Sequence, residues 1–180
     1  GPYEVQDLSG LDIAYANRKR LGWRTREGFP YIPIADRIVE ETGRLGRKTG
    51  AGWYDYEGGR QAPSPGIERI VVEESARAGI ARRAFSDDEI VARATTAMIE
   101  EGFRILEEGI AEKASDIDLV MTHGYASPRW RGGPMHFAGR LGLSEIQRRI
   151  ENFAAEDPLS WGVPNLLHRL VADGTSPDNL

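Results

Sequence analysis

A capped amphipathic helix in the middle of the chain is the feature that most constrains the fold. Ser86-Asp87-Asp88-Glu89 has the spacing of a capping box, in which a serine oxygen and a glutamate carboxylate each accept a backbone N–H of the first turn. Apolar side chains follow at helical spacing from Ile90 to Leu106. Gly109 is placed to end the helix in a left-handed conformation. The pattern predicts one long helix with a wide apolar stripe.

Similar signals along the chain predict further helices. Six other segments are predicted to be helical, at residues 12–21, 33–42, 66–78, 115–124, 144–153 and 164–173. Proline starts mark the second and last of these, serine starts the fourth and fifth, and Gly43 and Gly174 end the second and last. No stretch alternates apolar and polar residues for long enough to predict a sheet, and only Gly52 to Tyr56 looks extended. The sequence therefore predicts an all-α fold.

An internal repeat suggests how these helices are organised. Gly1 to Leu11 aligns without gaps on Gly133 to Leu143, matching Gly-Pro with Gly-Pro and Gly-Leu with Gly-Leu. We interpret the match as a duplicated helical unit whose first copy lacks its opening helix, although two unrelated helix starts remain an alternative. The glycines, prolines and serine before residue 66 favour a linker there. The predicted organisation is a truncated first repeat at 1–58, a linker at 59–65 and a second repeat with tail helices at 66–180.

Composition excludes several classes of protein. The chain has no cysteine, which excludes disulfides, Cys-ligated zinc and a thiol nucleophile, and which fits a reducing cytoplasm. A net charge of −5 argues against a nucleic-acid partner, because such proteins usually carry a basic excess. No apolar run approaches the roughly 20 residues that span a bilayer. We therefore predict a cytoplasmic protein without a membrane span or nucleic-acid partner.

No isolated motif predicts a cofactor or metal site. Gly43 to Thr49 lacks the spacing of a phosphate-binding loop, and the Gly50-Ala51-Gly52 start of a dinucleotide fingerprint has Asp55 where its third glycine belongs. The three histidines match no zinc signature: His123, His136 and His168. The sequence thus predicts no metal ligand and no nucleotide-binding residue in this chain.

Three segments in order nevertheless resemble one enzyme family. Gly1 to Asp12 is similar to a Gly-Pro-aromatic turn ending in Gly-Leu-Asp, and Gly46 to Tyr56 to a Lys-(Thr/Ser)-Gly-x-Gly-aromatic-Tyr signature. Gly124 to Met135 resembles the corresponding turn of a second copy. Together they resemble the C-terminal domains of 3-hydroxyacyl-CoA dehydrogenases of the multifunctional fatty-acid β-oxidation type.

This resemblance implies a fold and an activity. It implies two similar helical lobes, like the C-terminal domain of 6-phosphogluconate dehydrogenase, and oxidation of 3-hydroxyacyl-CoA to 3-ketoacyl-CoA by NAD. The family's His–Glu pair lies in an N-terminal Rossmann domain that is not in this sequence. The opening helix of the first copy, which would carry the family's Asn, is missing here. In the second copy the Asn position is occupied by Ala92, which cannot form the side-chain hydrogen bonds of an amide. We therefore assign no catalytic and no NAD-binding residue, and we expect the isolated chain to be inactive.

The resemblance also implies partners. In the parent protein these are the upstream Rossmann domain, an enoyl-CoA hydratase domain in enzymes that carry one, and the acyl-CoA substrate. Lys48, Trp53 and Tyr54 are the candidates for a contact with the substrate cleft or with the neighbouring domain. The duplicate is expected to replace the homodimer of single-copy relatives by a pseudo-dimer. The alternative is a free-standing helical interaction or CoA-binding module without catalysis.

Overall fold

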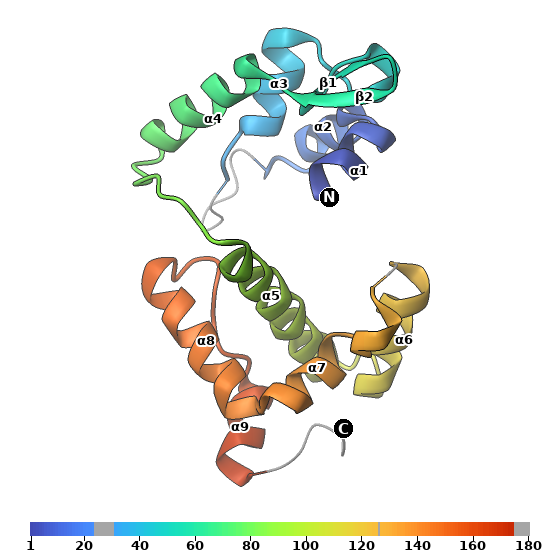
Figure 1. Cartoon of the computed structure of the whole chain (residues 1–180). Coiled ribbons are helices and arrows are strands. Elements are labelled where there is room, and N and C mark those ends of the chain that lie inside the picture. The colour runs from blue at the N-terminus through green and yellow to red at the C-terminus, as the bar shows by residue number, and fades with distance from the viewer. Residues whose placement is uncertain (24–30, 126, 175–180) are drawn as a thin grey trace. The chain divides into compact units, whose positions relative to one another are not determined.

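The computed structural model describes residues 1–23, 31–125 and 127–174. These residues form two compact units, one ending at Arg83 and the other beginning at Ala84. Both units are mainly helical (Figure 1). Among the described residues, no helix has the length and apolar character needed to cross a membrane.

The described residues of the first unit form four α-helices and one small hairpin. In chain order it contains helices α1 (Pro2–Ser9), α2 (Leu11–Arg20) and α3 (Ile34–Thr42), the short 3₁₀ turn η2 (Arg47–Thr49), strands β1 (Tyr54–Glu57) and β2 (Arg60–Pro63), and helix α4 (Pro65–Arg77). Its core is small and consists of buried aliphatic side chains: Leu11, Ile38, Ile67 and Ile70.

The predicted linker at 59–65 is wrong. Residues Arg60–Pro63 form β2, which pairs antiparallel with β1 in a register that joins Tyr54 to Pro63 and Glu57 to Arg60. Gly58 and Gly59 both adopt positive φ, 57° and 79°, as a tight two-residue hairpin requires. The glycines that suggested a flexible connection are therefore turn residues, and the boundary between the units lies at Arg83 instead.

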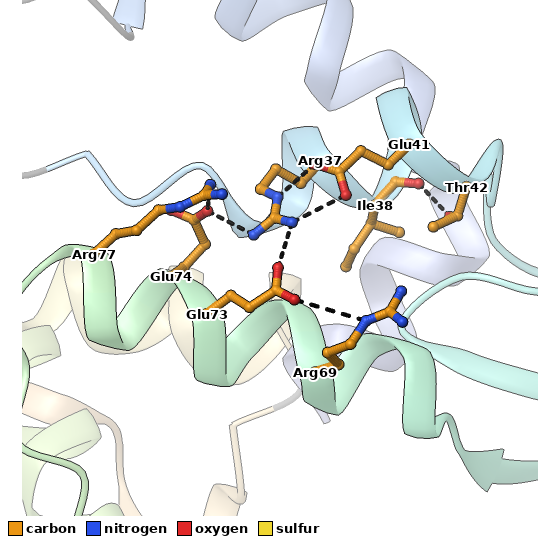
Figure 2. A network of polar contacts seen from close by, with 8 residues as sticks. All are labelled: Arg37, Ile38, Glu41, Thr42, Arg69, Glu73, Glu74 and Arg77. Atoms are coloured by element: carbon orange, nitrogen blue, oxygen red, sulfur yellow. Dashed lines mark hydrogen bonds and ion pairs between the residues drawn. The ribbon is translucent and has the colours of Figure 1, made fainter.

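A cluster of charged residues joins α4 to α3 (Figure 2). Arg37 of α3 donates to Glu74 and to Glu73 of α4, each at 2.7 Å, and to Glu41 of its own helix at 2.6 Å. Arg77 also pairs with Glu74, at 2.6 Å. Because Arg37 and Glu74 are both buried, each is stabilised by the opposite charge of the other. This ion pair connects α4 to α3, and α4 therefore belongs to the first unit.

The second unit is built around one long helix. Its elements are α5 (Asp87–Glu107), α6 (Ala114–Gly124), the 3₁₀ turn η3 (Arg129–Arg131), α7 (Pro134–Leu141), α8 (Leu143–Glu156) and α9 (Asn165–Asp173). Helix α5 contacts each of the other four α-helices. The buried core includes Ile99, Phe103, Met135, Ala138, Ile146, Ile150 and Leu167.

The start and end of α5 follow the sequence prediction. Ser86 Oγ accepts the backbone N–H of Glu89 at 3.2 Å, and Gly109 follows the helix with φ 69°. The expected apolar stripe is only partly buried, however. Ile90 and Val91 are 54% and 49% exposed, whereas burial begins at Thr96 and continues through Ile99 and Phe103. The first two turns of α5 thus present an apolar surface.

The two units share a helical pattern, as predicted for two similar lobes. Helices α1 and α7 each have eight residues with proline in the first turn, and each ends at a glycine of positive φ, Gly10 (101°) or Gly142 (88°). A buried leucine follows each glycine and opens the next helix. Helices α3 and α9 each have nine residues, a proline N-cap and a left-handed glycine C-cap. In the described part of the chain, the first unit has no counterpart of α5.

Candidate functional site

A buried carboxylate organises the Lys48 to Tyr56 segment of the first unit. Asp7, on α1, is 1% exposed. Its two oxygens accept the backbone N–H groups of Trp53 at 2.8 Å and Tyr54 at 3.1 Å, and the hydroxyl of Tyr56 at 2.8 Å. We call this arrangement the Asp7 clamp. Three donors satisfy a carboxylate that would be costly to bury without partners.

Two glycines in and just before this segment are required by this packing. A Cβ on Gly46 would lie 2.3 Å from the backbone oxygen of Asp7, and one on Gly52 would lie 1.9 Å from Asp7 Oδ1. Gly46 also has φ 100°, which favours glycine by itself. Gly46 and the second glycine of the Gly50-Ala51-Gly52 pattern therefore serve close approach to Asp7. The N–H groups of Ala51 and Gly52 already donate to Gly46 and Tyr54, which leaves no open backbone cradle for a phosphate.

The clamp changes the environment of the Tyr56 hydroxyl. Burial raises the pKa of Tyr56 above the ordinary tyrosine value, and the hydrogen bond that Tyr56 donates to Asp7 raises this pKa further. Tyr56 consequently stays protonated at neutral pH and acts as a hydrogen-bond donor to the clamp.

The three predicted contact residues lie together in this segment, and each already has partners within the first unit. Lys48 Nζ pairs with Asp12 at 2.5 Å, beside the first turn of α2. Trp53 Nε1 donates to Gln6 at 2.9 Å, and its ring lies 4.4 Å from that of Tyr3. Tyr54 opens β1 and contributes its backbone N–H to the clamp. Of the Lys48–Asp12 pair, the Lys48 side chain is the more exposed, at 48%.

In the second unit, the segment around Ala92 has a structural role. Arg93 pairs with Glu89 at 3.1 Å and with Glu156 of α8 at 2.6 Å. Its guanidinium also lies 4.4 Å from the centre of the Phe153 ring. Arg93 thus joins α5 to the end of α8, while Ala92 beside it offers no hydrogen-bonding side chain.

The described histidines form no recognisable catalytic pair or metal site. Among the described residues, no imidazole hydrogen-bonds a carboxylate. His136 contacts Asp118 through its backbone N–H, which donates at 2.8 Å. Within residues 1–23, 31–125 and 127–174, no cluster of three His, Cys, Asp or Glu side chains is arranged to hold a metal ion.

The most important residue that the sequence did not reveal is Asp7. Its partners lie 46 to 49 positions away, and an aspartate between Gln6 and Leu8 on a short helix is normally a surface residue. The one sequence signal that could have pointed to Asp7 is that this helix and the Gly-x-Gly-aromatic segment occur in the same chain.

Comparison with known proteins agrees with the resemblance. Residues 1–56 match the family model described as "3-hydroxyacyl-CoA dehydrogenase, C-terminal domain". Over 98% of its length, the chain is 38% identical to the "Peroxisomal bifunctional enzyme" of Danio rerio and 36% identical to that of Homo sapiens. Residues 1–56 thus match this C-terminal domain, and nearly the whole chain is similar to part of the peroxisomal bifunctional enzymes.

More distant relatives extend the comparison. The "Fatty acid oxidation complex subunit alpha" of Pseudomonas entomophila (strain L48) is 28% identical over 88% of the chain. The crystal structure of the dehydrogenase part of multifunctional enzyme 1 from C. elegans superposes with a TM-score of 0.68 at 25% identity, covering 94% of this chain and 38% of its own. The chain spans only 27% of the Danio rerio and Homo sapiens relatives, so these are much longer, multi-domain proteins.

Proposed function

We propose that the chain is the C-terminal helical portion of an NAD-dependent 3-hydroxyacyl-CoA dehydrogenase that acts in fatty-acid β-oxidation. In that reaction the carbon bearing the 3-hydroxyl transfers a hydride to NAD⁺ and the hydroxyl loses its proton, which yields 3-ketoacyl-CoA and NADH. The proposal rests chiefly on the similarity over 98% of the chain to relatives named as peroxisomal bifunctional enzymes.

The chain's own residues do not fit the chemical part of this reaction. The Gly50-Ala51-Gly52 backbone packs against Asp7 and the hairpin, so it cannot cradle the pyrophosphate of NAD. In the second copy the family's amide position is Ala92, and no described histidine is oriented by a carboxylate. The base and the nucleotide site therefore belong to the upstream Rossmann domain of the parent protein.

This chain would contribute a rigid surface that contacts the acyl-CoA or the adjacent domain. The Asp7 clamp holds the Lys48 to Tyr54 turn in one conformation, and Lys48 lies on its exposed side. A rigid turn that presents a cation suits a contact with the anionic acyl-CoA or with the adjacent domain, because little conformational entropy is lost on binding. We assign this role to Lys48, with Trp53 and Tyr54 as its supports.

The second lobe would act as an intramolecular partner. The two lobes share the pattern of α1 and α7 and of α3 and α9, which suits a pseudo-dimer in which one chain replaces two. The remaining three quarters of the relatives' length leaves room for the Rossmann domain and for an enoyl-CoA hydratase domain. The predicted cytoplasmic location stays a prediction, since several similar proteins are named as peroxisomal.

The experiment compares this 180-residue chain with a longer chain that includes the upstream dinucleotide-binding domain. NADH formation from a 3-hydroxyacyl-CoA is followed by absorbance for both. The longer protein should turn over, and the short chain should not. Robust turnover by the short chain would refute the proposal that the base and the nucleotide site lie outside it. No turnover by the longer chain, together with tight binding of CoA by the short one, would favour a free-standing binding module.

A further inference from the structure

A small cavity in the second unit is not used by any part of the proposed function. It has a volume of about 100 Å³ and is lined by residues of α5, α7 and the segment between α6 and α7 that includes η3. Helices α5 and α7 lie side by side in Figure 1. Met98 supplies apolar surface from α5, and Pro134 and Phe137 supply it from α7. The exposed apolar turns at the start of α5 lead toward Met98, which is itself 41% exposed.

The volume of the cavity limits what it can hold. Sites for drug-sized ligands measure roughly 300–1,000 Å³, so a cavity of about 100 Å³ cannot enclose a nucleotide, a CoA moiety or a long acyl chain. The cavity is half open and can receive one short apolar group. A ligand that binds here must therefore be small, or must insert only a short tail.

Arg131 is the only charged residue among the described residues that line this cavity. Its guanidinium lies 4.7 Å from the centre of the Trp130 ring, and no described carboxylate forms an ion pair with it. By contrast, Arg93 and Arg104 of the same unit pair with glutamates at 2.6 and 2.7 Å. A guanidinium that is held by an aromatic ring and lacks a carboxylate is suited to accept one from a ligand, in a bidentate geometry.

The wall of the cavity is held in place without a ligand. Asp118 of α6 accepts the backbone N–H groups of Met135 and His136, both at 2.8 Å, so it caps the first turn of α7. A Cβ on Gly133 would lie 2.4 Å from Asp118 Oδ1, so this contact leaves no room for a side chain there. Because Asp118 already occupies these amides, an incoming anion has Arg131 as its partner rather than the helix end.

We propose that this cavity binds a small carboxylate with a short apolar tail, the tail lying against Met98 and Phe137 and the carboxylate on Arg131. Ser127 also lines the cavity, and its hydroxyl could add a donor. No residue of the Asp7 clamp takes part, so the site stands independently of the dehydrogenase assignment.

The test is an NMR titration of the isotope-labelled chain with three probes. Sodium hexanoate carries both the tail and the charge, hexanol carries the tail alone, and sodium acetate carries the charge with almost no tail. Hexanoate should shift the amide signals of Thr95, Gly133 and Phe137 in a saturable way. Hexanol and acetate should each bind about tenfold more weakly, since each lacks one of the two interactions.

Two matched variants test whether Arg131 is the cation that binds the carboxylate. Arg131→Gln should weaken hexanoate binding about tenfold and leave hexanol binding unchanged. Arg129→Gln removes a cation from the same 3₁₀ turn at a position that does not line the cavity, so it should bind hexanoate like the wild type. If Arg131→Gln loses its dispersed spectrum, Arg131→Lys, which keeps the charge, should bind with intermediate affinity.

Three outcomes would overturn the proposal. Hexanoate shifts that do not saturate, or that appear outside this cavity, would mean that no such site exists. Equal binding of acetate and hexanoate would mean that the tail is not enclosed. Equal weakening by Arg129→Gln and Arg131→Gln would mean that only diffuse attraction to the positive turn is at work.

Discussion

Gly52 approaches the carboxylate of Asp7 so closely that a Cβ on Gly52 would lie 1.9 Å from Asp7 Oδ1. No side chain fits at that distance, so this glycine is required by its neighbour rather than by an unusual backbone angle. The same approach brings the N–H groups of Trp53 and Tyr54 onto the carboxylate. A segment that resembles part of a nucleotide fingerprint is therefore a hydrogen-bonded clamp between α1 and the hairpin.

Replacing Gly52 by alanine should destabilise the first unit by about 2 kcal/mol or more, because the methyl group must displace a buried carboxylate. The midpoint of that unit's thermal transition should fall by about 8 °C or more. Calorimetry measures the change. Gly66→Ala is the control, since the nearest atom to a Cβ there lies at 3.9 Å, and it should be neutral or slightly stabilising. Equal effects of the two substitutions would contradict the clamp.

Removing Arg37 should loosen α4 from α3. Arg37→Met leaves Glu73 and Glu74 of α4 facing Glu41 without the cation that Figure 2 places among them. The hydrogen bonds to Glu41 and Glu73 hold the pKa of Arg37 above its usual value, so no pH within the stable range neutralises it. We expect the first unit to melt at least about 5 °C lower.

The control for the Arg37 variant is Arg69→Gln. Arg69 is 75% exposed and lies 3.8 Å from Glu73, so its loss should change the melting temperature by no more than about 1 °C. The double variant Arg37→Met/Glu74→Met should recover part of the lost stability, because it leaves fewer unpaired charges near the helix contact. If the double variant is less stable than Arg37→Met, Glu74 still stabilises the unit when Arg37 is absent. Its pair with Arg77 would then be sufficient to stabilise Glu74.

The boundary between the units should be sensitive to protease. Residues 78–86 carry no helix or strand and are exposed, and Arg82 lies among them. Brief treatment with trypsin should cut at Arg82 or Arg83 and leave two folded fragments that separate near residue 83. Mass spectrometry identifies the cuts. Cleavage that begins within 59–65 instead would favour the sequence-based boundary over the structural one.

Asp118 should make the stability of the second unit fall as pH rises, which is the reverse of the usual effect of an aspartate whose pKa is lowered by folding. Burial raises the pKa of Asp118 above its ordinary value, despite the two N–H groups that it accepts. The native state thus binds a proton more readily than the unfolded state, so this group's contribution to stability is largest at low pH and falls as pH rises through the raised pKa.

Asp118→Asn removes that titration while keeping an acceptor oxygen. The stability of the wild type relative to the variant should therefore be greatest near the ordinary aspartate pKa of about 3.9 and should decline toward neutral pH. Chemical denaturation at several pH values measures the difference. A difference that grows with rising pH would mean that the bonds to Met135 and His136 outweigh burial.

The parts of the structure that could be predicted are those with local causes. Ser86 and Gly109 mark the ends of α5 within a few residues of the groups they satisfy, and the glycine stops of α3 and α9 act over one turn. The parts that could not be predicted depend on distant partners. Asp7 meets Trp53 across 46 positions, and Arg37 meets Glu74 across 37.

The error at residues 59–65 has the same origin. Gly58 and Gly59 suit both a linker and a tight hairpin turn, and local preference does not choose between them. The choice is made by Asp7, which holds the incoming end of β1, and by the packing of α4 on α3. The predicted contact residues Lys48, Trp53 and Tyr54 were found in one turn, but their roles in binding are still proposals.

Lys48 offers a way to separate structural from functional roles of the turn. In the parent enzyme, Lys48→Met should lower kcat/KM several-fold if the exposed ammonium meets acyl-CoA or the neighbouring domain. Asp12→Asn removes the same ion pair from the other side and leaves the cation in place. Both side chains are well exposed, so neither variant should alter the melting temperature appreciably. If the two variants reduce kcat/KM equally, the ion pair matters only for the shape of the turn. Suppose instead that only Lys48→Met lowers kcat/KM, and that the reaction rate falls most at subsaturating acyl-CoA. That result would identify the Lys48 ammonium itself as the group in contact with the substrate.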